Sequence, residues 1–325
     1  MVLKNMDCRF LDIDNDKKNA TREAFGATLV ELADSGLDIV AVDADLTCST
    51  TTSKLGEKRE SRLVNCGIAE QNMIDVAAGL ALTGKIAYTG SFSVFGTGRC
   101  YDQIRNTVCY SNLNVKVCPT HAGVSVGPDG GSHQMLEDLA LMTVLPNMRV
   151  LVPSDLNSAK AALRLASEVD GPVYVRLGRA KVGQVYSKDV KLELGGANVL
   201  REGSDCTIVA TGVEVAEAMK AAKVLSDEGV ECTVVDAYCI KPLNTDVIKD
   251  SVEATGGKVV VCEEHSINGG LCDKVSRLLA TNYPTHIEFV AVNDIFGTSG
   301  EMDELMVKFK LDFTSICEAV RRALS

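Results

Sequence analysis

Residues 61–91 read SRLVNCGIAEQNMIDVAAGLALTGKIAYTGS, and this stretch predicts a strand, a helix and a second strand in succession. SRLVNC is a short β-rich run, AEQNMIDVAAGLAL is a very apolar helical pattern, and Gly84 marks the end of the helix. KIAYTGS then returns to strand-like composition. Such a unit joins two parallel strands by a right-handed crossover, so the stretch predicts an α/β fold.

The same alternation extends outward from this unit in both directions. Further strands are predicted at LDIVAVD (37–43), NVKVCP (114–119), MRVLVPS (148–154) and PVYVRL (172–177), with helices over 22–35, 98–110, 135–144 and 155–168. Asn19 or Thr21 is expected to cap the first of these helices and Gly36 to end it. The helices are expected to cover both faces of one sheet.

The pattern changes near residue 180 and then resumes. Residues 180–205 show no helical period and are typical of a linker with short strands. A second alternation follows, with strands over 206–212, 231–238, 258–264 and 286–292 and helices over 213–228, 244–254 and 269–281. The segment IKPLNTD (240–246), after the second of these strands, is expected to be a turn. We therefore predict two domains, each a mostly parallel sheet flanked by helices: residues 1–182, a linker over 183–197, and residues 198–325.

Composition supports two globular domains and limits the class of partner. The chain has 325 residues, or about two domains at roughly 150 residues each. Thirty-three basic and 44 acidic residues give a net charge of −11, which argues against nucleic acid or an anionic membrane as a partner. The sequence shows neither a long apolar run nor the apolar core of a secretory signal, so we expect a cytoplasmic protein.

Several well-known site motifs are absent from the sequence. The 12 cysteines include no C-x-x-C pair, and we expect buried thiols in a reducing compartment, with no metal cluster on this chain. A P-loop, a dinucleotide-binding glycine motif, a G-x-S-x-G elbow and an H-E-x-x-H helix are all missing. The usual hydrolase and mononucleotide-binding interpretations therefore have no support.

Glu70 stands in the first turn of the apolar helix that follows SRLVNC, within NCGIAEQNM (65–73). One interpretation is an acid that stabilises the helix dipole. Phe92 and Phe95 follow the next strand at a spacing of three, and their ring faces suit a flat heterocycle. Filling of the core is the alternative for both rings.

A glycine-rich loop, THAGVSVGPDGGSHQ (120–134), comes directly after the strand NVKVCP. It gathers His121, Asp129 and His133 at the carboxyl end of that strand, and two of these are among only four histidines in the chain. Ligands of open α/β sheets bind at this edge. The loop therefore indicates a functional site.

In this combination and order, ADLTCST, GIAEQNM, SFSVF, THAGVSVGPDGGSHQ and GPVYVRLGR resemble the thiamine-diphosphate enzymes, and among them the transketolases. The resemblance runs from about residue 15 to the end and implies a pyrimidine-binding domain followed by the transketolase C-terminal domain. The family's G-D-G motif, which belongs to a further domain that holds the diphosphate and the metal, does not occur here. The chain thus resembles one subunit of a split transketolase.

The resemblance implies a cofactor role for four residues. Glu70 is expected to be catalytic, by sharing a proton with the ring nitrogen N1′ of the cofactor's aminopyrimidine. Phe92 and Phe95 would stack against that ring, and Asp45 would lie near the cofactor at a subunit interface, unless it only forms a turn at the strand end. Mg²⁺ or Ca²⁺ would be bound mainly by the partner subunit.

The resemblance also implies contacts to a ketose phosphate. Arg22, Ser49, His121 and Arg179 match positions that hold the phosphate, a task that suits the planar fork of arginine. Asp129 matches a contact to the C2 hydroxyl, and His133 matches a catalytic position near the C1 end. Without the resemblance, Arg22 and Arg179 would be interpreted as an exposed helix start and a loop ion pair. Pro128 departs from the family, where an acid usually precedes this aspartate.

The implied activity is transfer of a two-carbon ketol unit from a ketose phosphate to an aldose phosphate in the pentose phosphate pathway. The implied partner is an N-terminal subunit with the G-D-G motif, in an α2β2 heterotetramer, with self-association through the C-terminal domain. One alternative is the matching half of a 1-deoxy-xylulose-5-phosphate synthase, although that family tends to have arginine in place of His121. The beta subunit of a 2-oxoacid dehydrogenase and a non-catalytic scaffold subunit are the others.

Overall fold

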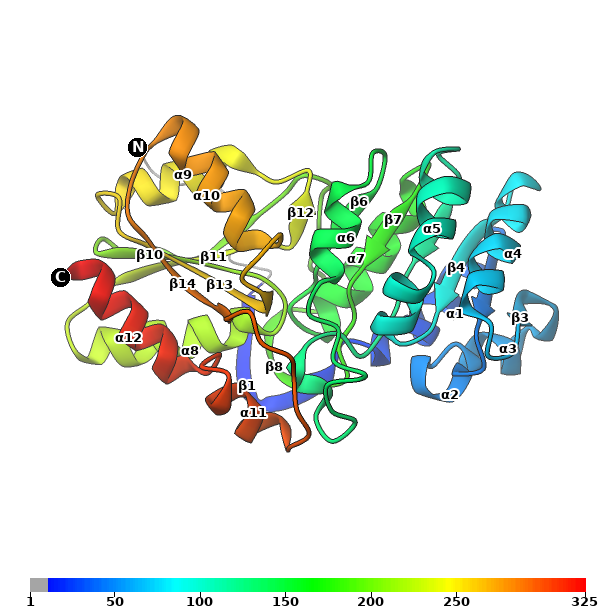
Figure 1. The fold of residues 1–325 in the computed structure, drawn as a ribbon, viewed down its shortest axis with the longest axis horizontal. Coiled ribbons are helices and arrows are strands. Elements are labelled where there is room, and N and C mark those ends of the chain that lie inside the picture. The colour runs from blue at the N-terminus through cyan, green and yellow to red at the C-terminus, as the bar shows by residue number, and fades with distance from the viewer. Residues whose placement is uncertain (1–10) are drawn as a thin grey trace.

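The computed structural model describes residues 11–325, and the first ten residues of the predicted N-terminal domain lie outside the described residues. Two sheets organise these residues, one in each half of the chain, and they lie side by side (Figure 1). A two-stranded antiparallel ribbon, β1 (Leu11–Ala20) with β8 (Lys181–Tyr186), accompanies them. The predicted α/β class with two mostly parallel sheets is confirmed.

The first sheet has seven strands in the order β12-β6-β7-β5-β4-β2-β3. All neighbours are parallel except β12, which runs antiparallel to β6. The central strands are buried along their whole length, because helices cover both faces of the sheet. The strands are β2 (Ile39–Asp43), β3 (Leu63–Asn65), β4 (Ile86–Gly90), β5 (Val115–Val117), β6 (Arg149–Leu151), β7 (Val173–Val175) and β12 (Cys239–Lys241).

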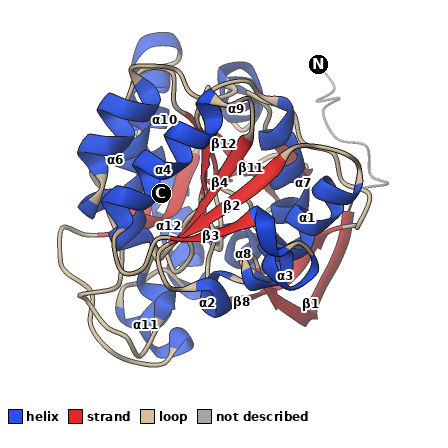
Figure 2. Ribbon diagram, turned by 90° about the vertical axis from the view of Figure 1, so that its right-hand side faces the viewer, coloured by secondary structure: helices blue, strands red, loops and turns tan. Residues whose placement is uncertain are grey.

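Two helical layers enclose this sheet, as Figure 2 shows in a view along the sheet. One layer holds α1 (Glu23–Asp34) and α7 (Leu156–Glu168), and the opposite one holds α4 (Glu70–Leu82) and α6 (Asp138–Val144). The shorter pieces are α2 (Thr47–Thr50), α3 (Ser53–Lys58), η2 (Glu60–Arg62), η3 (Val94–Arg99), α5 (Tyr101–Gln103), η4 (Ile104–Cys109) and η5 (Val124–Val126).

Some local features differ from the sequence predictions. The predicted helix over 98–110 is a longer run, η3-α5-η4, with two π-helical stretches. The helix predicted over 135–144 begins only at Asp138. Neither Asn19 nor Thr21 caps α1, because Asn19 donates to Glu23 and the Thr21 hydroxyl accepts from the Gly178 N–H. Gly36 does follow the end of α1, with a left-handed φ of 95°.

The second sheet has five strands in the order β14-β13-β10-β11-β9, and only β9 is antiparallel to its neighbour. Two helices after residue 300, which the sequence patterns did not single out, complete this half. The elements are β9 (Asn198–Arg201), β10 (Cys206–Ala210), α8 (Glu214–Asp227), β11 (Cys232–Asp236), α9 (Thr245–Ala254), β13 (Val259–Ser266), α10 (Leu271–Asn282), β14 (Ile287–Val292), α11 (Met302–Lys308) and α12 (Phe313–Leu324). No helix within residues 11–325 has the length and apolar character needed to span a membrane.

The two halves interlock through a strand that the sequence patterns had given as a turn. The segment IKPLNTD, expected to be a turn, begins inside β12, and β12 adds an edge to the first sheet although its residues lie in the second half of the chain. Lys241, at the end of β12, donates to the carbonyls of Thr143 and Leu145 at the end of α6. The halves therefore share a sheet edge as well as packed surfaces.

Asp155 fastens α7 to the ribbon strand β8. Its carboxylate accepts hydrogen bonds from the Ser158 N–H at 2.7 Å and from the Val185 and Tyr186 N–H groups at 2.8 Å each, and the side chain is buried. A single carboxylate thus caps α7 and satisfies two donors of β8.

We expect Asp155→Ala to lower the free energy of unfolding by about 3 kcal/mol, because it leaves several buried N–H groups without an acceptor. Urea unfolding followed by circular dichroism measures the change. The matched control is Asp34→Ala, which removes only an exposed ion pair with Arg59 and is expected to leave the unfolding midpoint unchanged. An equal loss of unfolding free energy in both variants would show that the buried hydrogen bonds of Asp155 stabilise the fold no more than an exposed ion pair does.

Candidate active site

The residues singled out from the sequence gather at the carboxyl ends of neighbouring strands in the first sheet. Phe92 follows β4, His121 follows β5 and Arg179 follows β7. Phe92 and Thr120 form an isolated parallel bridge, which brings the segments after β4 and β5 together. In open parallel sheets this edge is the usual place for a ligand site.

Four rings form one aromatic group at this edge. The rings of Phe92 and Phe95 are stacked, with centroids 6.2 Å apart and an interplanar angle of 20°. His121 lies 3.9 Å from the Phe92 ring, and His133 meets the Phe95 ring edge-on at 5.3 Å. Phe92 and Phe95 are both partly exposed and belong to neither hydrophobic core cluster, so they do not simply fill the core. The group offers ring surface to a planar ligand.

Glu70, the first residue of α4, is 3% exposed. Arg99 Nη1 donates to both carboxylate oxygens of Glu70 at 3.0 Å, and the Arg99 guanidinium lies 4.2 Å from the centroid of the Phe95 ring. Arg99 is 48% exposed, so one side of this pair faces solvent. Sequence reasoning missed Arg99, although its spacing of four from Phe95 in a helical run is a usable signal for a cation–π contact. Glu70 is therefore joined to the aromatic group through a cation.

His121 is buried with a left-handed backbone φ of 65°. Its Nδ1 lies 2.6 Å from the Thr120 hydroxyl. Burial and the charges of Arg22 and Arg179 lower the pKa of His121 to about 3, from an ordinary value of 6.5. The imidazole is consequently neutral at physiological pH and is available as a hydrogen-bonding group.

Two guanidinium groups flank His121. Arg22, the residue before α1, donates from Nη1 to the Ser49 carbonyl at 2.7 Å, and its Nε is buried with no hydrogen-bond partner among residues 11–325. Arg179 donates from Nη1 to the Val126 carbonyl. Burial and the nearby charge of Arg179 lower the pKa of Arg22, which marks two cations close together. The structure thus brings Arg22, Ser49, His121 and Arg179 into one cationic group with an unsatisfied donor.

Asp45 and Asp129 are placed differently from the rest, since both are exposed. Asp45 has a left-handed φ of 65°, and its carboxylate accepts from the Asn65 side-chain amide at 3.2 Å. Asp129 follows the exposed Pro128 at the tip of the loop, and its side chain makes no hydrogen bond or ion pair with any residue in 11–325. His133 lies further along the same loop, and its Nδ1 is 2.9 Å from the Ser132 hydroxyl oxygen.

The second half of the chain holds the loop that carries these residues. Glu264 Oε1, at the end of β13, accepts from the Ser125 N–H at 2.6 Å, and the Gln134 amide donates to the Thr298 carbonyl at 2.9 Å. Gly123 has a left-handed φ of 82°, and a Cβ there would lie 2.1 Å from a Glu264 oxygen. Only glycine permits this close approach. The sequence patterns gave no ligand or site residue in the second half, and Glu264 was missed.

Arg176 connects Glu264 to the first sheet. It forms a buried ion pair with Asp138 at 2.7 Å and donates to the Glu264 carbonyl at 3.0 Å, and the Tyr174 hydroxyl donates to Asp138 at 2.6 Å. Burial raises the pKa of Glu264, although Arg176 and the Ser125 bond oppose this. Burial also acts on Asp138, but Arg176 outweighs it and the pKa of Asp138 is lowered.

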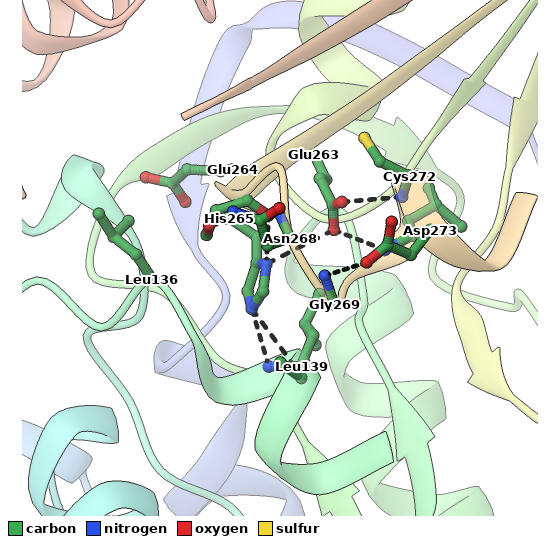
Figure 3. A network of polar contacts seen from close by, with 12 residues as sticks. Leu136, Leu139, Glu263, Glu264, His265, Asn268, Gly269, Cys272 and Asp273 are labelled. Carbon is green, nitrogen blue, oxygen red and sulfur yellow. Dashed lines mark hydrogen bonds and ion pairs between the residues drawn. The ribbon is translucent and has the colours of Figure 1, made fainter. Parts of the chain in front are cut away.

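His265 has a structural role at the start of α6 (Figure 3). Its Nε2 accepts from the Leu139 N–H at 3.2 Å, and its Nδ1 lies 2.7 Å from the Ser266 carbonyl, so the proton sits on Nδ1. Glu263 accepts from the N–H groups of Leu271 and Cys272 at the start of α10. These contacts join the start of α6 to β13 and α10. Within residues 11–325, no group of three or more His, Cys, Asp or Glu side chains is arranged to hold a metal ion.

Fold and site together define one part of an α/β enzyme site at the carboxyl edge of a parallel sheet, with a buried carboxylate, exposed ring faces and a cationic group. Residues 17–184 match the family "Transketolase, pyrimidine binding domain", and residues 195–316 match "Transketolase, C-terminal domain". The chain belongs to the transketolase family.

Individual relatives agree with this assignment. The chain is 43% identical over 92% of its length to a putative transketolase C-terminal section of Methanocaldococcus jannaschii, covering 94% of that protein. It is 38% identical over 92% of its length to a 6-deoxy-6-sulfo-D-fructose transketolase subunit of Clostridium sp. (strain MSTE9), covering 92% of that protein. Human transketolase is 34% identical over 94% of this chain, but the match covers only 49% of the human protein.

A solved structure described as a split gene transketolase, inactive beta4 tetramer, shares the fold. Its TM-score is 0.87 at 45% identity, over 95% of this chain and 99% of that one. The chain is thus similar both to separately encoded C-terminal sections and to the corresponding half of a longer transketolase.

The residues present fit the cofactor that the family implies, thiamine diphosphate. Glu70 is a buried carboxylate at the border of the aromatic group, and Phe92 and Phe95 keep part of their ring surface exposed. A carboxylate beside open ring faces suits a protonatable aminopyrimidine. Among residues 11–325, no His, Cys, Asp or Glu cluster is arranged to hold the metal that accompanies a diphosphate.

The neutral state of His121 predicts a pH dependence of stability. The unfolded chain binds a proton at this histidine below about pH 6.5, whereas the folded chain does so only near pH 3, so protonation favours unfolding between these values. We expect the free energy of unfolding to fall more steeply from pH 7 to pH 5 in the native protein than in His121→Asn. Urea unfolding at both pH values measures the two differences. Equal differences would contradict a lowered pKa.

Proposed function

We propose that the chain is the pyrimidine-binding subunit of a thiamine-diphosphate-dependent transketolase, which transfers a two-carbon ketol unit from a ketose phosphate to an aldose phosphate. The observation that carries the proposal is the placement of Glu70, the aromatic group and the Arg22–Arg179 cations along one sheet edge. Family membership, which implies thiamine diphosphate dependence, supports it.

Glu70 and the two phenylalanines form the proposed cofactor half-site. Glu70 holds and returns a proton at N1′ of the aminopyrimidine, while Phe92 and Phe95 bind the flat ring and exclude water from it. Bound thiamine diphosphate supplies the nucleophilic carbon and the electron sink for cleavage of the ketose carbon–carbon bond. Arg99 orients the Glu70 carboxylate through Nη1, and it shares that carboxylate with the pyrimidine when the cofactor is present.

The cationic group forms the proposed binding site for the distal anion of the sugar. Arg22 and Arg179 supply the positive charge, and His121 and Ser49 add neutral polar contacts. The buried Nε of Arg22 has no acceptor among residues 11–325 and can donate to the anion. His133, edge-on to Phe95, contacts the reacting end of the ketose, and Asp129 contacts the C2 hydroxyl. Pro128 stiffens the backbone beside Asp129.

A second subunit completes the proposed enzyme. It carries the G-D-G domain, binds the diphosphate with Mg²⁺ or Ca²⁺, and assembles with this chain as an α2β2 heterotetramer in the cytoplasm, with Asp45 near the subunit interface. The similarity to a C-terminal section and to half of human transketolase supports a missing N-terminal partner. The solved relative described as an inactive β4 tetramer supports self-association of this chain and inactivity without the partner.

The distal anion of the substrate need not be a phosphate. The Clostridium relative is named for a sulfonated ketose, 6-deoxy-6-sulfo-D-fructose. A pair of guanidiniums binds sulfonate and phosphate oxygens through the same donor geometry. We place the enzyme in the pentose phosphate pathway, and a direct comparison of xylulose 5-phosphate with the sulfonated ketose tests that choice.

We expect the chain mixed with its partner to convert xylulose 5-phosphate and ribose 5-phosphate, and Glu70→Ala to reduce kcat by about 10²- to 10⁴-fold through loss of the proton-holding group. Glu57→Ala, on the exposed face of α3, is the control and should be unchanged. Thiamine diphosphate titration of the assembled complex adds a second readout. Ketol transfer by this chain alone would refute the split enzyme, and consumption of pyruvate would favour a deoxyxylulose-phosphate synthase.

Arg179→Gln should raise KM for xylulose 5-phosphate by about 10- to 100-fold, because one cationic fork is lost from the phosphate site. Unphosphorylated xylulose should show little change in the same variant. Steady-state kinetics of the assembled enzyme measures both. Arg201→Gln, which breaks an ion pair on β9 far from the site, is the matched control. Equal effects on the two sugars would assign Arg179 to loop structure alone.

A further inference from the structure

A cavity lies at the junction of the two halves, among α6, β12 and α10. These elements are neighbours across the junction in Figure 1. Its volume is about 850 Å³, and its apolar floor includes Ile240, Leu243 and Leu278. The cavity adjoins the C-terminal end of α6, before β6 begins. That position is on the side of the strand amino ends, so the cavity is separate from the candidate active site at the carboxyl ends.

The charge of this cavity is one-sided. Lys241, Lys274 and Arg277 line it, and none of the described residues that line it is acidic. Two further cavities lined by described residues, of about 550 and 520 Å³, mix both signs: Glu168 and Asp189 line one, and Glu288 and Glu318 line the other. The lining of this cavity therefore carries only positive charges, although acidic residues outnumber basic ones in the chain by 44 to 33.

The cations of the cavity keep unused donors. Lys241 donates to the carbonyls of Thr143 and Leu145, which occupies two of its three N–H groups. Neither Lys274 nor Arg277 forms an ion pair with a carboxylate within residues 11–325. The nearest acids are engaged with backbone N–H groups: Asp273 accepts from Gly269, and Glu263 accepts from Leu271 and Cys272.

Repulsion between these cations is visible at Lys274. Burial, and after it the charges of Arg277 and Lys241, lower the pKa of Lys274, and Asp273 and Glu263 offset this only in part. An anion in the cavity would remove that repulsion and satisfy the free donors. The hydroxyls of Thr143 and Thr245, which also line the cavity, are additional donors for a polar ligand.

We propose that this cavity binds a small phosphorylated metabolite, with the phosphate held by Lys274, Arg277 and the free N–H of Lys241 and the uncharged body on the apolar floor. The volume lies in the range of small-molecule sites. Three cations match the charge of a phosphate dianion better than that of a single carboxylate, and arginine binds phosphate oxygens in pairs. Because the walls come from both halves, the ligand joins α6 to α10.

The test uses inorganic pyrophosphate as the probe and the full chain with Arg179→Gln as the parent, so that the candidate active site is weakened. Isothermal titration should show saturable binding to this parent. Adding Lys274→Met and Arg277→Gln should weaken it by at least about tenfold, as the loss of two charge-assisted contacts requires. Adding Lys249→Met, on α9 with its own acidic neighbours, should leave it unchanged.

A tungstate soak of a crystal of the chain supplies a readout that needs no variant, and the anomalous peak is expected beside Lys274 and Arg277. Absence of saturable binding at millimolar pyrophosphate, an unchanged affinity in the double variant, or an equal loss in Lys249→Met would each overturn the proposal. None of these results involves ketol transfer, so the proposal stands or falls independently of the proposed enzyme activity.

Discussion

The buried guanidinium of Arg176 is the interaction on which the arrangement of the two halves and of the candidate site depends. It lies at the end of β7 and reaches Asp138 at the start of α6 on one side and Glu264 at the end of β13 on the other. Breaking a buried ion pair on one side leaves an uncompensated charge in the interior, which costs several kcal/mol. The geometry of this triad is therefore strongly enforced, and it includes a carboxylate from each half of the chain.

The triad of Arg176, Asp138 and Glu264 positions the glycine-rich loop of residues 120–134. Glu264, held by Arg176, accepts from the Ser125 N–H in the middle of the loop, while His265 beside it caps α6, where Asp138 stands. Gly123 lets the loop backbone approach the Glu264 carboxylate closely. His121 and His133 lie on either side of these contacts in the sequence, so a residue of the other half holds the loop that carries both rings. The second half thus shapes the site without entering it.

Sequence patterns predicted the strands of both sheets except β9 and β12, and therefore the edge where the site lies, because buried parallel strands form clear apolar runs. Glu70, Phe92 and Phe95 were recognisable because each follows such a run at a short, fixed spacing. Glu264 was not, since its partner Ser125 lies 139 residues away in sequence. The pairing of Arg99 with Glu70, 29 residues away, was equally hidden, and only its spacing of four from Phe95 gave a signal. β12 was missed for the same reason: its pairing with β6 depends on the approach of the two halves, and local composition indicated only a turn around Pro242.

Positively charged side chains cluster at the candidate site, although the chain has a net charge of −11. At the candidate site, the neutral state of His121 keeps the cationic group to two guanidiniums. Burial, and after it the charge of Arg179, already lowers the pKa of Arg22. A protonated His121 would add a third cation to this buried group and raise the cost of folding. Holding the imidazole neutral leaves a group that still donates and accepts hydrogen bonds, while the buried Nε of Arg22 has no acceptor among residues 11–325. Within residues 11–325, no carboxylate forms an ion pair with either guanidinium, so the positive charge at this edge is balanced only when an anion binds, as the proposed function requires.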